Sequence, residues 1–328
     1  MRSAFAVLSA IFSIGSLAAQ TPVAGPTEGF IFDLPTNSLR AIVGILGSAS
    51  LGPAILPKLD YASVAPQKNY AIAFQDGRCL IVSGLDSEQV TTTTLSGEFS
   101  APEGIAWSGD GSVAVLYSRT GNWVRTISDL PVSPNAASLL DLSSLGGALS
   151  TVAADLHGEH VVIGITGDNA GVFQIASDQS FLPLVPVAKP ISLAFADDRR
   201  QLYIMDGELM QLTEFNLADS TSQAWRINEL EDPIAFRPAR DAAQRQVIYV
   251  AGRGDRSLVV YDSSTHEVIG RVSLAFQPSS IEILGRHSYL LRPRASFDDP
   301  LWSFRNSAQP MVYFVPATPL IAGEDSSR

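Results

Sequence analysis

The stretch from Val247 to Val272 decides the fold class, and it reads VIYVAGRGDRSLVVYDSSTHEVIGRV. Three short runs rich in Val, Ile and Tyr are separated by segments of Gly, Asp, Ser and Thr. Such runs are typical of β-strands joined by tight turns, and the polar segment 263–266 supplies turn residues. Because Pro233-Ile234-Ala235-Phe236 adds another apolar run just before them, the stretch predicts a unit of four antiparallel strands.

The same pattern recurs along the chain. A run that ends in small or apolar residues, a polar turn and a second apolar run align six times, at Val64, Ala106, Ala153, Ala194, Ala235 and Ile283. The spacings between these positions are 42, 47, 41, 41 and 48 residues. A period of about 40–50 residues with four strands per unit is typical of β-propeller blades. One four-stranded sheet cannot bury both of its apolar faces, whereas a ring of sheets buries all of them. The sequence therefore predicts an all-β fold, a β-propeller over residues 29–317.

The number of blades depends on residues 29–47, which precede the six aligned units. They contain two clear strands, 29–33 and 39–44, that look like the two outer strands of a blade, so the chain is predicted to open in mid-blade. The last unit already has outer strands at 302–304 and 311–315, which leaves no vacancy there. Seven blades with a reduced first blade are therefore predicted, closed by packing and strand pairing, and six blades are the alternative.

The quoted stretch resembles the YVTN-type β-propeller repeat. Tyr249-Val250 ends a strand, a second strand leads to Asp262, and Pro278-Ser279 follows the third strand, as in that repeat. Ala251-Gly252 departs from it, because Thr-Asn is usual there. The match is pattern-level over the rest of residues 59–317. The resemblance implies a propeller fold in a secreted bacterial protein of unknown function, and it implies no particular reaction, because propellers include binding proteins and enzymes alike.

The N-terminus predicts export. Arg2 precedes an apolar run over residues 4–17, and small residues allow cleavage near 18–20, as in a signal peptide. Residues 1–20 are therefore predicted to be removed, which leaves a linker at 21–28, the propeller, and a disordered tail at 318–328. The mature chain is expected to be periplasmic or extracellular, with no membrane span.

The charge and the cysteine content limit the partners and the covalent cross-links that we expect. The formal net charge of −11 argues against nucleic acid as a partner, because nucleic acid binding is favoured by clustered Lys and Arg. Cys79 is the only cysteine, so an intramolecular disulfide is impossible, and its apolar neighbours predict a core position. A monomer is expected, with an unknown protein or small ligand as its partner.

Candidate binding residues lie on the segments that usually meet ligands in propellers, the loops between second and third strands and the connections into each first strand. The residues predicted there are Glu103, Arg119, Asn122, Asp168, Asp206, Asp232, Arg253 and Arg292. Asp and Asn are also what tight turns require, so a purely structural role is the alternative for each of them.

Nothing in the sequence predicts a catalytic residue, a metal ion or a cofactor. Glu103, Asn122, Asp168 and Asp232 could supply oxygens to calcium, but no spacing singles them out. His157-Gly158-Glu159-His160 contains two potential metal ligands, but it lies in a turn expected to face away from the usual site. Two functions follow: an exported non-catalytic binding or scaffold protein, or alternatively an extracytoplasmic enzyme, such as a lactonase-like hydrolase, with its site at the channel mouth.

Overall fold

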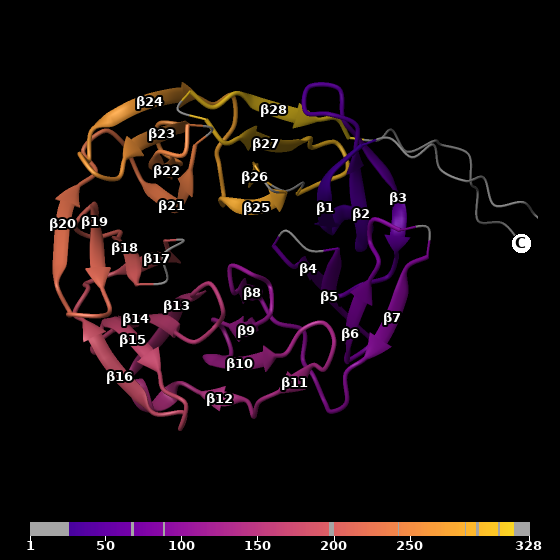
Figure 1. Ribbon diagram of the computed structural model, residues 1–328, viewed down its shortest axis with the longest axis horizontal. Coiled ribbons are helices and arrows are strands. Elements are labelled where there is room, and N and C mark those ends of the chain that lie inside the picture. The colour runs from indigo at the N-terminus through magenta and orange to yellow at the C-terminus, as the bar shows by residue number, and fades with distance from the viewer. Residues whose placement is uncertain are drawn as a thin grey trace, which may run out of the picture.

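The protein is a seven-bladed β-propeller, in which seven small antiparallel sheets surround a central axis (Figure 1). The computed structural model describes residues 26–66, 69–87, 89–196, 200–241, 243–285, 287–292, 295–307 and 309–317. The predicted signal peptide at 1–20 and the predicted tail at 318–328 lie outside the described residues. Within the described part of the chain, no helix is long and apolar enough to cross a membrane.

The strands of each blade are numbered in chain order, and in blades 2 to 7 this order runs from the axis outward. Blade 1 contains β1 (Thr27–Asp33), β2 (Ser38–Val43) and β3 (Ser50–Leu56), and blade 2 contains β4 (Tyr61–Val64), β5 (Tyr70–Gln75), β6 (Arg78–Ser83) and β7 (Thr91–Thr94). Blade 3 contains β8 (Gly104–Trp107), β9 (Ala114–Ser118) and β10 (Trp123–Ser128), with a divided outer strand, β11 (Asn135–Ala136) and β12 (Leu140–Asp141). Blade 4 contains β13 (Gly147–Ala154), β14 (Val161–Gly167), β15 (Gly171–Ile175) and β16 (Phe181–Val185).

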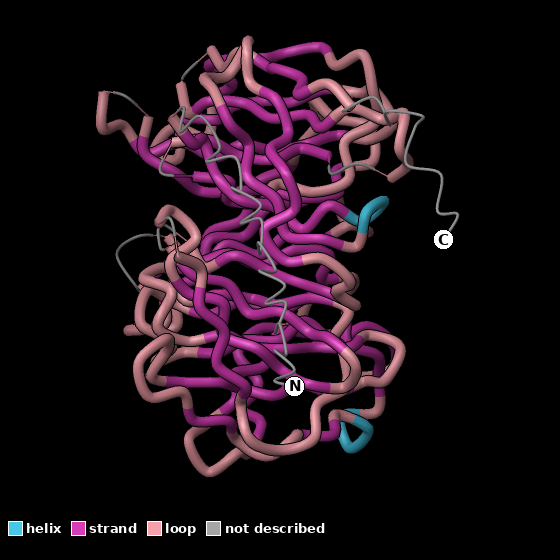
Figure 2. The backbone as a smooth tube through the Cα atoms, turned by 90° about the vertical axis from the view of Figure 1, so that its right-hand side faces the viewer, coloured by secondary structure: helices cyan, strands magenta, loops and turns pink. Residues whose placement is uncertain are grey.

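The remaining blades have four strands each. Blade 5 contains β17 (Pro190–Phe195), β18 (Gln201–Asp206), β19 (Gln211–Asn216) and β20 (Ser222–Arg226). Blade 6 contains β21 (Pro233–Arg240), β22 (Gln246–Gly252), β23 (Ser257–Asp262) and β24 (Val268–Ser273). Blade 7 contains β25 (Glu282–Gly285), β26 (Ser288–Arg292), β27 (Leu301–Arg305) and β28 (Val312–Val315). Among the described residues, the helices are two single turns, η1 (Leu34–Thr36) and η2 (Ser143–Leu145), coloured cyan in Figure 2.

The core consists of apolar layers between neighbouring blades. Phe74 of blade 2 and Leu116 of blade 3, for example, belong to one buried cluster, and Met205 of blade 5 and Val250 of blade 6 belong to another. Second strands are buried on both faces because each lies between two neighbouring sheets, which explains their continuous apolar runs. The outer strand β7, by contrast, is exposed along its whole length and consists of threonines.

The three strands of blade 1 correspond to the second, third and fourth strands of the other blades. The Leu59 amide donates a hydrogen bond to the Asn37 carbonyl at 2.8 Å. In other blades the same bond joins the connection after the fourth strand to the loop between the second and third strands, as in Leu142 to Asn122, Ile227 to Met210 and Leu274 to Arg256. Asn37 also shares the left-handed backbone of these acceptors, with φ of 46°. The β1–β2 loop therefore corresponds to a second-to-third loop.

The chain thus opens in mid-blade, but the interpretation of 29–33 and 39–44 as an outer pair was wrong by one place. They are the second and third strands, and β3 is the fourth. The sequence pattern of β3 is weak because Gly52 and Pro53 interrupt it, and proline is tolerated only at the edge of a sheet. Within the described residues, no strand lies inside β1, between β25 and β4.

Blades 1 and 7 close the ring by packing. Ile31, Ile42 and Leu51 share a buried cluster with Leu284, Leu290, Leu301 and Val315. The backbones approach so closely that a Cβ at Gly29 would lie 2.1 Å from the Leu284 carbonyl oxygen. An ion pair between Arg305 and Glu28 at 2.6 Å adds to the seam. The predicted strand pairing across this seam was wrong for the described residues, since β1 pairs only with β2 and β28 only with β27.

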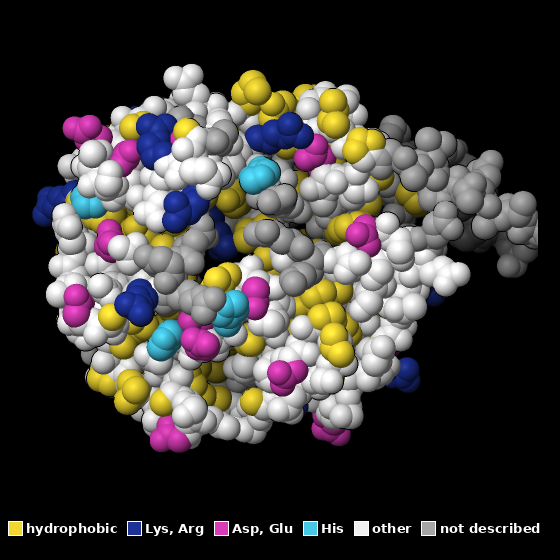
Figure 3. Space-filling model, in the orientation of Figure 1, with side chains coloured by type: hydrophobic (Ala, Val, Ile, Leu, Met, Phe, Trp, Pro, Cys, Tyr) yellow, Lys and Arg dark blue, Asp and Glu magenta, His cyan; other side chains and the backbone are white. Residues whose placement is uncertain are grey.

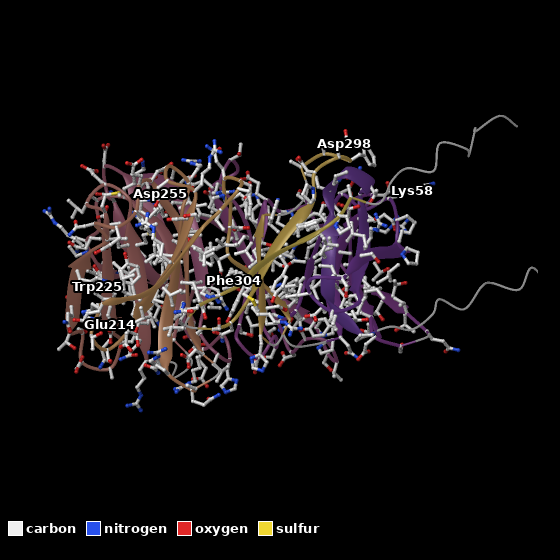
Figure 4. The ribbon with its side chains drawn as sticks, turned by 90° about the horizontal axis from the view of Figure 1, so that it is seen from above. Lys58, Glu214, Trp225, Asp255, Asp298 and Phe304 are labelled. Atoms are coloured by element: carbon white, nitrogen blue, oxygen red, sulfur yellow. The ribbon has the colours of Figure 1, made fainter. Side chains whose placement is uncertain are left out.

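The propeller has two distinct faces. Lys58, Asp255 and Asp298, from connections and second-to-third loops of three blades, lie toward one face, and Glu214 lies toward the other (Figure 4). We name the first the mouth face. The other, which carries the turns between first and second and between third and fourth strands, is the turn face. Figure 3 shows the turn face, where His side chains and the central opening are visible.

Candidate functional site at the channel mouth

Three polar side chains lie at the mouth-face ends of strands in blades 2, 3 and 7. Tyr61 begins β4 in blade 2, Tyr117 lies near the end of β9 in blade 3, and Glu282 begins β25 in blade 7. The charge of Glu282 contributes to the raised pKa of both phenols. Blade 1 stands between blades 7 and 2, and its strand β1 contacts both β25 and β4.

Gly104 is the residue that lets Tyr117 reach the axis. The two residues are paired across β8 and β9, and β8 is the innermost strand of blade 3. A Cβ at Gly104 would lie 2.3 Å from the Tyr117 hydroxyl oxygen, so the phenol occupies the space over this glycine. Any larger residue at position 104 would displace the ring.

Glu103 and Arg119, two of the residues predicted from sequence, lie beside these phenols. Arg119 Nε is 3.5 Å from Glu103 Oε2, and Glu103 Oε1 accepts hydrogen bonds from Ser118 Oγ at 2.9 Å and the Thr120 amide at 2.8 Å. The hydrogen bonds from Thr120, with those from Ser118 and Arg119, lower the pKa of Glu103 to about 2. Glu103 is therefore a carboxylate that offsets the charge of Arg119. We name Tyr61, Glu103, Tyr117, Arg119 and Glu282 the mouth cluster.

The other three members have raised pKa values. Glu282 is an exposed residue, and desolvation by the surrounding protein is the main cause that raises its pKa. Burial is also the largest cause of the raised pKa of Tyr61 and of Tyr117, and the charge of Glu282 contributes to both. The phenols are therefore neutral at physiological pH, and each can donate and accept hydrogen bonds.

A pocket of about 320 Å³ opens on the same face, between blades 6 and 7, and is lined by Ile234, Arg253, Gln277, Pro278 and Ser279. Arg253 Nε lies 2.7 Å from Asp232 Oδ2, so these two predicted residues form an exposed ion pair at its rim. The volume is within the range of about 300–1,000 Å³ common for small-molecule sites.

The remaining predicted residues are not brought together. Asp206 is 3 % exposed and accepts hydrogen bonds from the amides of Ala188, Glu208 and Leu209. It therefore stabilises the conformation of its own loop. The Asn122 side chain bonds the Gly147 carbonyl and the Leu149 amide, which joins blade 3 to blade 4. Asp168 is exposed in the β14–β15 loop. Arg292 lies in β26, and its side chain is outside the described part of the structure.

The residues considered for metal binding also have separate partners. Glu103, Asn122 and Asp232 each bond neighbouring protein groups, as given above. His157 Nδ1 lies 2.7 Å from Asp110 Oδ2 and His160 Nδ1 lies 3.0 Å from Gln174 Nε2, both on the turn face. Among the described residues, no group of three or more His, Cys, Asp or Glu is placed to hold a metal ion.

Sequence reasoning missed Tyr61, Tyr117 and Glu282. In the sequence the two tyrosines look like ordinary strand aromatics, and Glu282 looks like a solvated strand residue. Two sequence signals were available. One is a glutamate in the short, otherwise apolar run 281–284, and the other is a glycine at the start of the run 104–107.

The fold and this site define a seven-bladed β-propeller with a polar cluster at one mouth. No family model and no curated protein sequence matches the chain, so the YVTN repeat type stays a prediction. Among solved structures, the chain is similar to a functionally unknown protein from Desulfotomaculum acetoxidans DSM 771, with a TM-score of 0.53, 15% identity, and coverage of 75% of this chain and 78% of that one.

Two enzymes share the fold as well. A streptogramin B lyase matches with a TM-score of 0.55 and 7% identity, over 79% of this chain and 88% of that one. The dihydro-heme d1 dehydrogenase NirN, in complex with DHE, matches with a TM-score of 0.58 and 10% identity, over 89% of this chain and 63% of that one. At such identities the likeness shows the fold alone.

Proposed function

We propose that the protein is an exported, non-catalytic propeller that binds a small polar ligand at the mouth cluster. The observation that supports this is the gathering of polar side chains at the mouth-face ends of strands in blades 2, 3 and 7, with Arg119 Nε 3.5 Å from Glu103 Oε2 beside Tyr117. Phenols, carboxylates and a guanidinium group on one face are the kinds of polar group that orient a small ligand.

Binding suits the chemistry of the cluster better than catalysis. The raised pKa values of Tyr61 and Tyr117 keep the phenols neutral, which makes them poor bases and poor nucleophiles. Glu103 is engaged by Arg119, Ser118 and Thr120. Covalent catalysis needs a nucleophile held by an adjacent base, whereas binding needs only the donors and acceptors that these side chains already present.

Export rests on the signal-peptide pattern of residues 1–20. Expressed in a bacterial host with its own N-terminus, the protein should be recovered from the exported fraction beginning near residues 18–20. N-terminal sequencing or intact mass measurement tests this, and an exported product that retains Met1 would contradict it.

Ligand binding is tested by a thermal-shift screen of small polar compounds that includes sugars, carboxylates and amines. Any compound that raises the melting temperature by mass action is retested on Tyr61→Phe and Glu282→Gln, which should lose the shift. Glu208→Gln is the matched control, because Glu208 is an exposed glutamate on the same face outside the cluster. If all three variants respond like the wild type, the ligand does not bind at the mouth cluster.

A further inference from the structure

We infer that the pocket between blades 6 and 7 binds a neutral sugar ring, with Arg253, Asp232 and Gln277 as its main hydrogen-bonding groups. The pocket has a volume of about 320 Å³ and is lined by Ile234, Arg253, Gln277, Pro278 and Ser279. None of these residues belongs to the mouth cluster. The inference therefore goes beyond the proposed function and adds a second site on the same face.

Backbone hydrogen bonds hold two sides of this pocket in place. On the side of blade 6, the Arg253 amide donates to the Asp232 carbonyl at 3.0 Å, which joins the β22–β23 loop to the connection from blade 5. On the side of blade 7, the amides of Ser279 and Ser280 both donate to the Leu291 carbonyl, at 3.1 and 3.2 Å. Because these segments are already fixed, little backbone freedom is lost when a ligand binds between them.

The ion pair of Arg253 with Asp232 presents donors and acceptors side by side. Arg253 Nε lies 2.7 Å from Asp232 Oδ2, so the two charges offset each other. Among the described residues, no side-chain hydrogen bond engages the Nη nitrogens of Arg253 or Oδ1 of Asp232. A guanidinium group only donates and a carboxylate only accepts, whereas a hydroxyl group does both. One hydroxyl of a sugar can therefore accept from Arg253 while its neighbour donates to Asp232.

The side formed by blade 7 adds further groups that suit a sugar. Gln277 and Ser279 are exposed, and neither side chain makes a hydrogen bond to another described residue. The amide of Gln277 and the hydroxyl of Ser279 can each donate and accept. Ile234 and Pro278 supply apolar surface, against which the C–H groups of a sugar ring can pack. Apolar surface with a few polar groups is typical of small-molecule sites.

Ligands of other classes fit this pocket less well. An anion drawn to Arg253 would also meet the Asp232 carboxylate, and the chain's formal net charge of −11 opposes its approach. A cation drawn to Asp232 would meet Arg253 in the same way. A wholly apolar ligand would remove water from the ion pair without replacing its hydrogen bonds. A neutral ring with several hydroxyl groups needs no counter-ion and can bond both members of the pair.

The probe is methyl α-D-glucopyranoside, with the corresponding galactopyranoside and mannopyranoside as stereoisomers. Cyclohexylmethanol is the ring with a single hydroxyl group, and sodium glucuronate is the anionic analogue. Binding to the mature protein is detected by saturation-transfer NMR, and affinities are obtained by NMR titration. We expect at least one of the three glycosides to bind, more tightly than cyclohexylmethanol and at least as tightly as glucuronate.

Two variants test the residues of the pocket. Arg253→Met removes the donors but keeps much of the side-chain length, and it should weaken the binding of the glycoside about tenfold or more, as expected when a hydrogen bond to a charged group is lost. Gln277→Leu should weaken it about threefold or more. Arg256→Met is the matched control, because Arg256 is an exposed arginine of the same loop outside the pocket. All three positions are exposed, so the variants should melt like the wild type.

Each contrary outcome has a distinct meaning. Equal binding of cyclohexylmethanol, tighter binding of glucuronate, or unchanged binding of the glycoside in Arg253→Met would each overturn the sugar inference. If Tyr61→Phe or Glu282→Gln abolishes the binding of the glycoside and Arg253→Met does not, the sugar inference fails and the proposed function stands. If no glycoside binds, the sugar inference also fails, and the proposed function is then decided by the carboxylates and amines of its own screen.

Discussion

The Tyr117 phenol lies over the Cα of Gly104, in the space that a side chain at position 104 would occupy. A Cβ there would be 2.3 Å from both the hydroxyl oxygen and the ring carbon that carries it. This close approach places a second-strand side chain over the innermost strand of blade 3, so the position of the Tyr117 ring depends on the absence of one methyl group.

Gly104→Ala should therefore displace the Tyr117 ring. We expect a loss of about 1–3 kcal/mol in the free energy of unfolding, as for other overpacked positions, measured by urea denaturation. The double variant with Tyr117→Ala should show strong coupling, because alanine at 104 costs little once the ring is gone. Additive effects of the two substitutions would contradict the contact.

The seam between blades 1 and 7 should contribute strongly to stability. Ile42 is fully buried in the cluster shared by these blades, and Ile42→Ala should lower the free energy of unfolding by about 2–5 kcal/mol. Ile45→Ala is the control, because Ile45 is 57% exposed and its truncation should change stability by less than about 0.5 kcal/mol. Equal effects of the two substitutions would mean that packing at the seam is not what closes the ring.

Asp110 should make stability depend on pH. Burial acts to raise its pKa, but hydrogen bonds from Ser112, His157 and Ser108 outweigh it, so the pKa lies below the ordinary 3.8. A lowered carboxyl pKa stabilises the fold above pH 3.8, and this contribution is lost as the pH falls toward the folded-state pKa.

Asp110→Asn should accordingly cost about 1–3 kcal/mol at pH 7 and progressively less below pH 3.8. Urea denaturation at a series of pH values measures this difference. Asp168→Asn, which removes an exposed charge, should show little effect at any of them. A difference between wild type and Asp110→Asn that stays constant down to pH 2.5 would count against the ionised, hydrogen-bonded Asp110.

Cys79 should be unreactive in the folded protein. It is fully buried, and burial raises the pKa of its thiol to about 12. A thiol reagent at pH 8 should label the native protein slowly and label it fully after denaturation in urea. Thr93→Cys, at an exposed outer-strand position, supplies the reactive control, and rapid labelling of native Cys79 would refute its core position.

Much of the fold could be predicted because the strands and turns of a blade are determined by short, local stretches of sequence. Apolar runs such as 247–250 indicate buried strands, and polar segments such as 263–266 indicate chain reversals. The six full units were therefore predicted at their observed places. The first blade was harder. Gly52 and Pro53 obscure β3, and the place of β1 in its sheet is visible only from the bond between Leu59 and Asn37.

The candidate site was predictable only in part, for the same reason. Glu103 with Arg119, and Asp232 with Arg253, were found because turn and loop chemistry marks the mouth face. Their partners at the axis were not found, because a tyrosine that crosses a neighbouring strand has the same local pattern as one in the core.

The sequence by itself determined the period, the four-stranded unit and the face on which polar loops gather, since these follow from local burial and turn requirements. Only the tertiary structure decided which side chains meet. Tyr61, Tyr117 and Glu282 are far apart in the chain, and their place on one face of the ring depends on ring closure and, for Tyr117, on the missing side chain of Gly104. Such contacts are set by the geometry of the whole ring, which no short stretch of sequence contains.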